Sequence, residues 1–456
     1  MSTISAKHVF CIGIGGIGVS GLAELLHHQG IKVSGSDPTP NALTSRLKSL
    51  GITIFHEHAE SNITDADLIV YSSAVSKNNP ERVAGKKRGI LQITRGQLLA
   101  NCSDTYQTIL IAGTHGKTTT SGLMSWVFEQ AEQDPTFIVG GVLRDRDSTM
   151  RAGQSRFFIA ESDESDASFL LLSPTAAVIT NIDADHMETY EHNFEKLKDS
   201  FLQFVSAIPD DGFVVLCIDN PVLCELLPKI KARVITYGES IDADYQLKNF
   251  EQNGLQSTFT VNGREITVNL GGKHNALNAL SVIIVADEYH LPKNAVESAL
   301  KTFPGMRRRM HPRGEMRLKN GAALVFDDYG HHPVELEVTL KAAKAAFPDR
   351  RIVLVFQPHR YTRTRDLMRE FVDVLKMADC LVLMEVYAAS EACIEGADGK
   401  ALFDAVKKTG MENCVFVPEL SQLPEKLKAM LQANDVIILQ GAGNIVTMAT
   451  VLTENK

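Results

Sequence analysis

The sequence lacks the marks of secreted and membrane-spanning proteins. Its seven cysteines are odd in number, lie far apart and include no CxxC pair. This distribution fits free thiols in a reducing compartment better than a disulfide framework. No run of about 18 or more apolar residues occurs, so a transmembrane helix is not expected. The N-terminus has neither the apolar core nor the cleavage site of a signal peptide. We therefore expect a cytoplasmic protein that is not inserted in a membrane.

An excess of positive charge is also absent. The chain has 46 Lys and Arg against 55 Asp and Glu, for a net charge of −9. Non-specific binding to nucleic acid or to an anionic membrane requires a broad basic surface. We therefore expect no nucleic-acid partner, and any anionic ligand must be held by local positive groups. The sequence does not indicate the oligomeric state.

What the chain does have is the size and pattern of a multidomain α/β protein. At roughly 150 residues per domain, 456 residues suggest about three domains. Short apolar runs rich in β-branched residues alternate with amphipathic stretches, a pattern typical of βαβ units with parallel sheets. The pattern starts near residues 8, 108 and 322. We predict a Rossmann-like N-terminal domain, a central P-loop ATPase-like domain with a mainly parallel sheet, and a Rossmann-like C-terminal domain. The expected boundaries are 1–106, 107–312 and 313–456.

Local composition suggests how these domains are joined. The polar segment 101–107 is predicted to be a linker. Segment 303–315 is rich in Pro, Gly and charge and interrupts the strand pattern, so the second boundary is placed there. Within 256–270, polar and apolar residues alternate on both sides of an Asn-Gly pair, which predicts a β-hairpin.

The first glycine-rich turn has the pattern of a nucleotide-binding loop. Gly13, Gly15 and Gly18 form GxGxxG between a predicted strand and helix, and Asp37 ends the next strand. Such glycines allow the backbone to approach a pyrophosphate at the helix N-terminus, while the acidic residue accepts ribose hydroxyl groups. The motif predicts a nucleotide diphosphate but not the group attached to it. Taken alone, it would suggest an NAD-dependent dehydrogenase.

The second glycine-rich turn, GTHGKTTT at 113–120, predicts a phosphate loop. It is shorter than the GxxxxGK[ST] template but supplies the same groups: backbone N–H groups, Lys117 for the β- and γ-phosphates, and the Thr118 hydroxyl for Mg²⁺. A lysine beside the positive end of a helix dipole is unfavourable without an anion. We therefore predict that this loop binds a nucleoside triphosphate.

Acidic clusters follow the next two predicted strands. They lie in segments 160–166 and 180–190 and comprise Glu161, Asp163, Glu164, Asp166, Asp183 and Asp185, with His186 beside them. Mg²⁺ prefers oxygen ligands, so these clusters predict metal binding next to the phosphate loop. The spacing alone leaves open whether Glu161 or Glu164 is the ligand.

Two basic clusters lie further along the chain, at 307–313 and at 359–365. Clustered arginines are common partners of phosphate and carboxylate groups. For any one of these arginines, a solvated surface position is an equally good interpretation.

Together and in this order, the motifs resemble those of the Mur ligases. The resemblance extends from Gly13 to the GAGN at 441–444. The segments that carry the resemblance are GIGGIGVSGLAELL, SGSD, SSAV followed by NNPE, GTHGKTTT, ESDESDASFL, TNIDADHMETY, GGKHNALNAL, FDDYGHHPVE and FQPHRYTRTRDL.

The resemblance to the Mur ligases implies an ATP-dependent amide-forming ligase of peptidoglycan precursor synthesis, with ATP and Mg²⁺ as cofactors. The implied reaction joins L-alanine to the carboxylate of UDP-N-acetylmuramate through an acyl phosphate. The alternative within the family attaches a recycled peptide, but the GIGGIG start resembles it less.

The resemblance also implies residue roles. Around the sugar nucleotide it places Gly15, Gly16, Gly18, Asp37 and Ser73. Around ATP it places Gly113, Thr114, His115, Gly116, Lys117, Thr118, Thr119, His274, Asn275, Asn278, Arg308 or Arg309, Asp328, Tyr329, His331 and His332, with Tyr329 also assigned to the substrate. The implied metal ligands are Thr118, Glu161 and His186. Lys117, His186, His359 and Arg360 are the expected catalytic residues, and Arg363 is expected to face the amino acid and the intermediate. No lysine matches the carbamylated lysine of sibling enzymes, and the base that accepts the amine proton is not identified, although His359 is a candidate.

Overall fold

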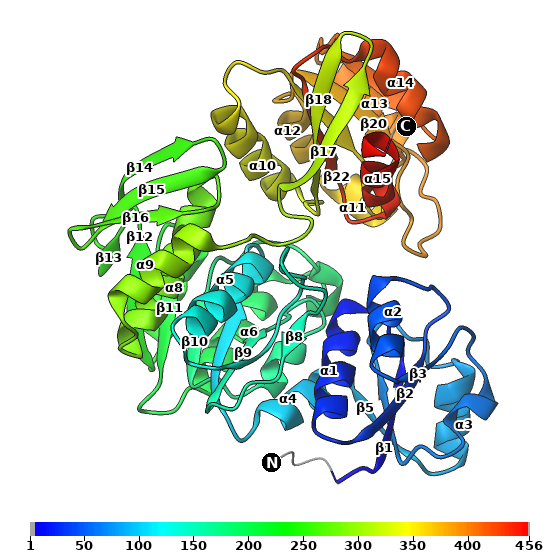
Figure 1. Ribbon diagram of the computed structural model, residues 1–456, viewed down its shortest axis with the longest axis vertical. Coiled ribbons are helices and arrows are strands. Elements are labelled where there is room, and N and C mark those ends of the chain that lie inside the picture. Colours follow the sequence, from blue (N-terminus) through cyan, green and yellow to red (C-terminus); the bar gives the residue numbers. More distant parts are fainter. Residues whose placement is uncertain (1–4, 455–456) are drawn as a thin grey trace. The chain divides into compact units, whose positions relative to one another are not determined.

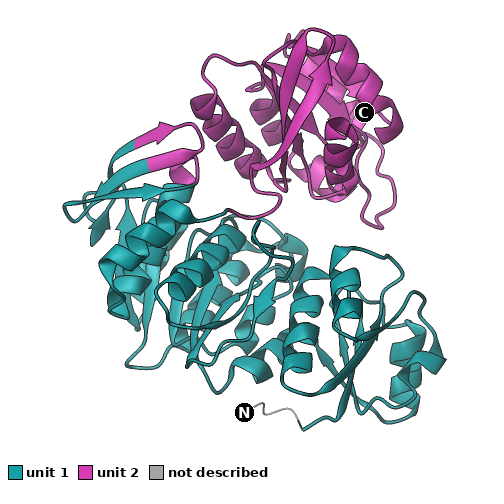
Figure 2. Ribbon diagram, viewed as in Figure 1, with its two compact units in different colours: residues 1–250, 258–269, 275–304 teal, residues 251–257, 270–274, 305–456 magenta. Residues whose placement is uncertain are grey.

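The computed structural model describes residues 5–454 (Figure 1). Within them, helices accompany four β-sheets of five, eight, three and six strands. The chain divides into two compact units: residues 1–250, 258–269 and 275–304 form unit 1, and residues 251–257, 270–274 and 305–456 form unit 2 (Figure 2). The predicted α/β class with mainly parallel sheets is confirmed. Among the described residues, no helix has the length and hydrophobicity needed to span a membrane.

The first sheet of unit 1 has five parallel strands in the order β3-β2-β1-β4-β5. The strands are β1 (His8–Ile12), β2 (Lys32–Ser36), β3 (Thr53–Phe55), β4 (Leu68–Tyr71) and β5 (Leu91–Thr94). The helices are α1 (Ile17–His28), α2 (Ala42–Ser49), α3 (Pro80–Lys87) and α4 (Arg95–Ser103). All five residues of β1 are buried, as expected for the central strand of a parallel sheet. The βαβ unit predicted around the first glycine motif is confirmed.

The second sheet of unit 1 has the order β13-β12-β11-β10-β6-β9-β7-β8. Its strands are β6 (Gln107–Ala112), β7 (Thr136–Ile138), β8 (Met150–Arg151), β9 (Phe157–Glu161), β10 (Ala176–Ile179), β11 (Phe213–Cys217), β12 (Arg233–Gly238) and β13 (Tyr245–Gln246). All are parallel except the pair β7–β8. The helices are α5 (Lys117–Gln130), α6 (Phe194–Ser206), α7 (Pro221–Leu226), α8 (Lys273–Glu288) and α9 (Lys293–Thr302). Because β9 and β10 flank β6, the segments that follow these three strands meet at one edge of the sheet.

The three-stranded sheet contains the predicted hairpin. Its strands are β14 (Lys248–Asn253), β15 (Gln256–Val261) and β16 (Arg264–Val268), in that order. Asn262 and Gly263 connect β15 to β16, and both have positive φ, 49° and 74°. Two central residues with positive φ are typical of the tight turn that Asn-Gly favours, so the hairpin prediction is confirmed.

The sheet of unit 2 has the order β17-β18-β22-β19-β20-β21. Its strands are β17 (His311–Leu318), β18 (Gly321–Asp328), β19 (Ile352–Phe356), β20 (Cys380–Met384), β21 (Cys414–Val417) and β22 (Val436–Gln440). The helices are α10 (Pro333–Ala346), α11 (Tyr361–Asp366), α12 (Met368–Leu375), α13 (Gly399–Lys407), α14 (Leu423–Met430) and α15 (Thr447–Thr453). Apolar residues of the strands pack on both faces, which explains their continuous apolar runs.

Two connecting segments contain regular structure that was not predicted. Segment 303–315, where the second boundary was placed, ends in β17, a missed strand that is antiparallel to β18 at the edge of the sheet. Only Met316 of β17 is buried, and an edge strand tolerates the proline and charges that concealed it. The linker expected at 101–107 is also largely structured, since α4 runs to Ser103 and β6 starts at Gln107. The buried Leu98, Leu99 and Cys102 hold α4 against the core, so the helix extends into the first part of this polar stretch.

Candidate active site

The predicted phosphate loop connects β6 to α5 and is tied to the segment after β10. Gly116 has a φ of +88°, and a Cβ atom there would lie 2.9 Å from Asn278 Oδ1, so this position requires glycine. The His115 N–H donates to Asn181 Oδ1 over 2.9 Å, and Thr180 Oγ1 donates to the His115 carbonyl over 2.6 Å. Thr180 and Asn181 were not predicted to shape this loop. The signal was present, because they are the first polar residues after a buried strand.

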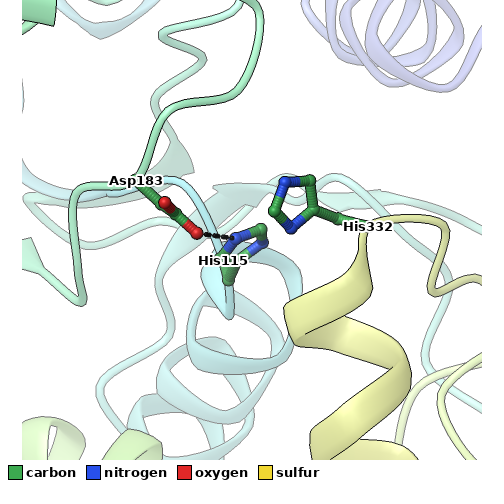
Figure 3. Close-up of side chains that lie close together, drawn as sticks. All are labelled: His115, Asp183 and His332. Carbon is green, nitrogen blue, oxygen red and sulfur yellow. Dashed lines mark hydrogen bonds and ion pairs between the residues drawn. The ribbon is translucent and has the colours of Figure 1, made fainter. Parts of the chain in front are cut away.

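Two predicted side chains of this region contact each other. His115 Nε2 lies 3.3 Å from Asp183 Oδ2 (Figure 3). The Asp183 N–H also donates to Thr114 Oγ1 over 2.9 Å. The acidic segment after β10 is therefore held against the phosphate loop, as the neighbouring positions of β6 and β10 require.

Lys117, the first residue of α5, forms an internal ion pair. Its Nζ lies 2.8 Å from Glu164 Oε2 and donates to the carbonyl of Gly113 over 2.6 Å. Burial acts to lower the pKa of Lys117, but the carboxylates of Glu164, Asp163 and Glu161 outweigh it, so the pKa is raised. The lysine was expected to need a bound anion. The structure shows instead that Glu164 already supplies a negative partner.

Glu161 and Thr118 form a separate pair of oxygen donors. Thr118 Oγ1 donates to Glu161 Oε2 over 3.0 Å, and the Gly140 N–H donates to the same oxygen, also over 3.0 Å. A hydroxyl beside a carboxylate is a ligand set that suits Mg²⁺. Because Glu164 pairs with Lys117, the geometry favours Glu161 over Glu164 as the metal ligand. Thr119, the next residue of α5, is buried.

The remaining predicted metal residue lies on the segment after β10. His186 has a φ of 54° and directly precedes a short 3-10 helix, Met187–Tyr190. Its Nε2 lies 3.5 Å from Asp185 Oδ2. An acidic neighbour orients the ring, but these contacts do not by themselves bring His186 to Thr118 or Glu161.

A pocket of about 280 Å³ lies in unit 1 between the first glycine loop and the end of β9. Among its lining residues are Gly16, Gly18, Ser73 and Glu161. The structure therefore brings residues predicted to bind the sugar nucleotide to the same pocket as the predicted metal carboxylate. The Gly15 N–H donates to Asp37 Oδ2 over 2.9 Å, so Asp37 also holds the glycine loop in place.

Arg95 lines this pocket and was not predicted from the sequence. It is the first residue of α4, and its guanidinium lies 3.6 Å from Asp163, 3.9 Å from Asp166 and within hydrogen-bond distance of Ser168. Its side chain is 17% exposed. The sequence carries no signal for it, because a single arginine after a short strand has no motif.

The segment at the start of α8 contributes amides beside the phosphate loop. Asn278 lies next to Gly116 in unit 1, and its Nδ2 donates to Asn275 Oδ1 over 3.3 Å. His274 belongs to unit 2. Burial, reinforced by the charge of Arg309, lowers the pKa of His274 to about 4. Its ring is therefore neutral at physiological pH.

Because its pKa is lowered, His274 makes the stability of the folded protein depend on pH in the acid range. The unfolded chain binds a proton at His274 near the ordinary pKa of 6.5, whereas the folded chain binds it only near pH 4. Stability from this group is therefore present above pH 6.5 and is lost as the pH falls towards 4. We expect His274→Asn to lose less thermal stability than the wild type between about pH 7 and pH 4.5 in calorimetry. An equal loss in both proteins would contradict this assignment.

The first basic cluster packs against an aromatic side chain of unit 2. The guanidinium groups of Arg308 and Arg309 lie 4.6 and 5.5 Å from the Tyr329 ring centroid. Arg308 also donates to the Gly441 carbonyl over 2.7 Å. Arg308 is thus part of the folded C-terminal unit rather than a solvated surface residue.

Histidines and tyrosines form a row beside this cluster. Ring centroids are 5.3 Å apart for Tyr329 and His331, 5.8 Å for His331 and His359, and 5.6 Å for His359 and Tyr387. Burial, then His331 and the charges of neighbouring arginines, lower the pKa of His359 to about 3. Such a weak base is poorly suited to accept a proton from an amine. Tyr387, which stacks on His359, was not predicted from the sequence.

The other predicted residues of unit 2 organise loops around this row. Asp328 accepts hydrogen bonds from the Met310 and Gly330 N–H groups, each over 2.8 Å. Glu335 accepts from the N–H groups of His331 and His332 at the start of α10. Arg363 Nη1 lies 3.4 Å from His359 Nδ1, and Arg360 Nη1 lies 3.9 Å from Glu391.

Three family models match consecutive parts of the chain. They are the Mur ligase family catalytic domain at residues 8–107, the Mur ligase middle domain at 111–286, and the Mur ligase glutamate ligase domain at 308–443.

Individual relatives match over nearly the full length. UDP-N-acetylmuramate--L-alanine ligase of Coxiella burnetii is 51% identical over 454 residues, which cover 98% of each chain. Among solved structures, UDP-N-acetylmuramate-alanine ligase MurC of Thermotoga maritima matches with a TM-score of 0.84 and 29% identity, covering 98% of both chains. A murein peptide ligase of Psychrobacter arcticus matches with a TM-score of 0.71 and 22% identity, over 99% of both chains, and shares the fold.

Proposed function

Because the chain belongs to the Mur ligase family, we propose for it the reaction named for its 51% identical relatives. It is an ATP-dependent ligase that joins L-alanine to UDP-N-acetylmuramate in peptidoglycan precursor synthesis. The observation that supports this proposal is the 51% sequence identity over 98% of both chains. An NAD-dependent dehydrogenase would not explain why the chain has a phosphate loop with Lys117. The murein peptide ligase of Psychrobacter arcticus is 22% identical and shares the fold, which does not favour a peptide-recycling ligase.

In the first proposed step, the muramoyl carboxylate attacks the γ-phosphate of ATP, giving an acyl phosphate and ADP. Both reactants are negatively charged, so their repulsion is the main obstacle. Lys117 would exchange its partner Glu164 for the phosphates and hold them by charge, while the phosphate-loop N–H groups and Asn278 orient them. Thr118 and Glu161 would hold Mg²⁺, which neutralises charge on the phosphate oxygens. His186 is proposed for a second ion.

In the second proposed step, the amine of L-alanine attacks the acyl carbon and phosphate leaves. Arg360 and Arg363 are suited to hold anionic groups of the amino acid and the intermediate. The low pKa of His359 favours a hydrogen-bonding role in place of proton uptake. We therefore do not assign it as the base.

The sugar nucleotide is proposed to bind at the first glycine loop, with its diphosphate near Gly15, Gly16 and Gly18. The pocket that runs from this loop to Glu161 supports the assignment, because it would direct the muramoyl carboxylate towards the phosphoryl-transfer site.

We further propose the domain limits 1–106, 107–312 and 313–456. A cytoplasmic location is also proposed, and the seven free cysteines support it.

The direct test is phosphate release from ATP with substrates supplied singly and together. We expect release only when UDP-N-acetylmuramate, L-alanine and Mg²⁺ are all present, with an equal amount of the alanyl product detected by mass spectrometry. Release that requires a peptide in place of L-alanine would favour the recycling ligase. Substrate-dependent oxidation of NADH would favour a dehydrogenase.

A further inference from the structure

A buried carboxylate on α1 joins three segments of unit 1. Glu24 is 3% exposed. Arg46 of α2 donates to both of its oxygens, from Nε to Oε2 over 3.0 Å and from Nη2 to Oε1 over 2.5 Å. Ser148, which precedes β8 and is 5% exposed, donates to Oε2 over 2.8 Å. None of these three residues lines the pocket described above.

The same helix approaches β8 and β7 very closely. A Cβ atom at Gly21 of α1 would lie 2.7 Å from Thr149 Oγ1 and 3.4 Å from Ile138 Cγ2. Both neighbours are buried, so neither has free space to move into. Figure 1 shows α1 alongside β8, in agreement with the contacts between these elements. The packing between α1 and the β7–β8 pair is therefore too close to admit even a methyl group at Gly21 without a shift.

This contact connects the two sides of the substrate pocket. On one side, the N-terminus of α1 carries Gly16 and Gly18 of the glycine loop. On the other side, β7 leads directly to Gly140, whose N–H donates to Glu161 Oε2 over 3.0 Å. The position of α1 on β7 and β8 therefore determines the distance between the glycine loop and Glu161, the proposed metal ligand.

We propose that Glu24, Arg46 and Ser148 are positioning residues that set the distance between the bound sugar nucleotide and the phosphoryl-transfer site. A buried, charge-assisted set of hydrogen bonds is strongly directional, so it holds the helix in one place. The proposal rests on the proposed function, because the distance matters only if a carboxylate of the sugar nucleotide attacks a phosphate. Reacting groups misplaced by about 1 Å can lose roughly 10²-fold in rate.

The test uses the full-length protein with two small changes. Ser148→Ala removes the hydroxyl that donates to Glu24 and accepts from the Met150 N–H of β8. Gly21→Ala inserts a methyl group between α1 and Thr149. We expect each to lower kcat about tenfold at saturating ATP, UDP-N-acetylmuramate and L-alanine. Because the individual binding surfaces are untouched, the Kd of UDP-N-acetylmuramate and of ATP, each measured alone by calorimetry, should change less than about twofold.

The matched control is Ser125→Ala, which removes a buried hydroxyl whose hydrogen bond among residues 5–454 stays within α5, to the Ser121 carbonyl. It should keep the wild-type kcat. If Gly21→Ala does not fold, Ser148→Ala decides the matter. A kcat of Ser148→Ala within about twofold of the wild type overturns the proposal, as does a loss of kcat matched by equally weakened binding of each substrate alone. An inactive wild type would instead overturn the proposed function, and this proposal with it.

Discussion

Lys117→Ala is expected to lower ATP-dependent phosphate release by about 10³-fold or more. The side chain lies at the end of the phosphate loop, where its ammonium is the cation best placed to offset the charge of the ATP phosphates. Alanine removes that charge and also leaves Glu164 buried without its partner, which adds repulsion towards a phosphate. The measurement is ADP and phosphate formation at saturating UDP-N-acetylmuramate and L-alanine.

Binding of UDP-N-acetylmuramate should remain within about twofold of the wild type, because Lys117 does not line the pocket at the first glycine loop. Lys198→Ala provides a matched control. Lys198 is about as shielded as Lys117, with a side chain 10% exposed against 12%, and it pairs with Glu195 and Glu225 on helices away from the loop. Equal losses of activity in the two variants would refute a specific role for Lys117.

Much of the fold could be predicted because its parallel strands are buried on both faces and read as continuous apolar runs. β6, β9 and β10 illustrate this, because each contains a buried apolar run that is followed by polar or glycine residues. β17 was missed for the opposite reason. β17 is a charged edge strand with one buried side chain, so its sequence shows no alternating or continuous apolar pattern. It is recognised as a strand by its pairing with β18.

The candidate site could be predicted where backbone conformation dictates the residue, as at Gly116, whose φ of +88° requires glycine. It was not predictable where partners come from distant segments. The pairing of Lys117 with Glu164, and of Thr118 with Glu161, depends on which carboxylate of one short segment faces which of two adjacent residues at the start of α5. Tyr387 was missed because its stacking on His359 depends on the pairing of two loops.

Glu161→Gln is expected to lower kcat by roughly 10²-fold or more and to raise the Mg²⁺ concentration needed for half-maximal activity. The amide can still accept from Thr118 and from the Gly140 N–H, so the local structure should be retained while one negative charge is lost. Weaker metal binding, and not misfolding, would then cause the defect. Activity should consequently recover in part at high Mg²⁺, as measured by phosphate release over a metal titration.

Glu129→Gln is the matched control for this change. Glu129 lies near the end of α5 and pairs with Arg146 and Arg151, so its neutralisation removes an equal charge from the same unit without touching the phosphate loop. It should leave the Mg²⁺ dependence unchanged. If Glu161→Gln were fully active with an unchanged Mg²⁺ requirement, Glu161 could not be the metal ligand. If Glu164→Gln alone shifted that requirement, the assignment of the two carboxylates would have to be exchanged.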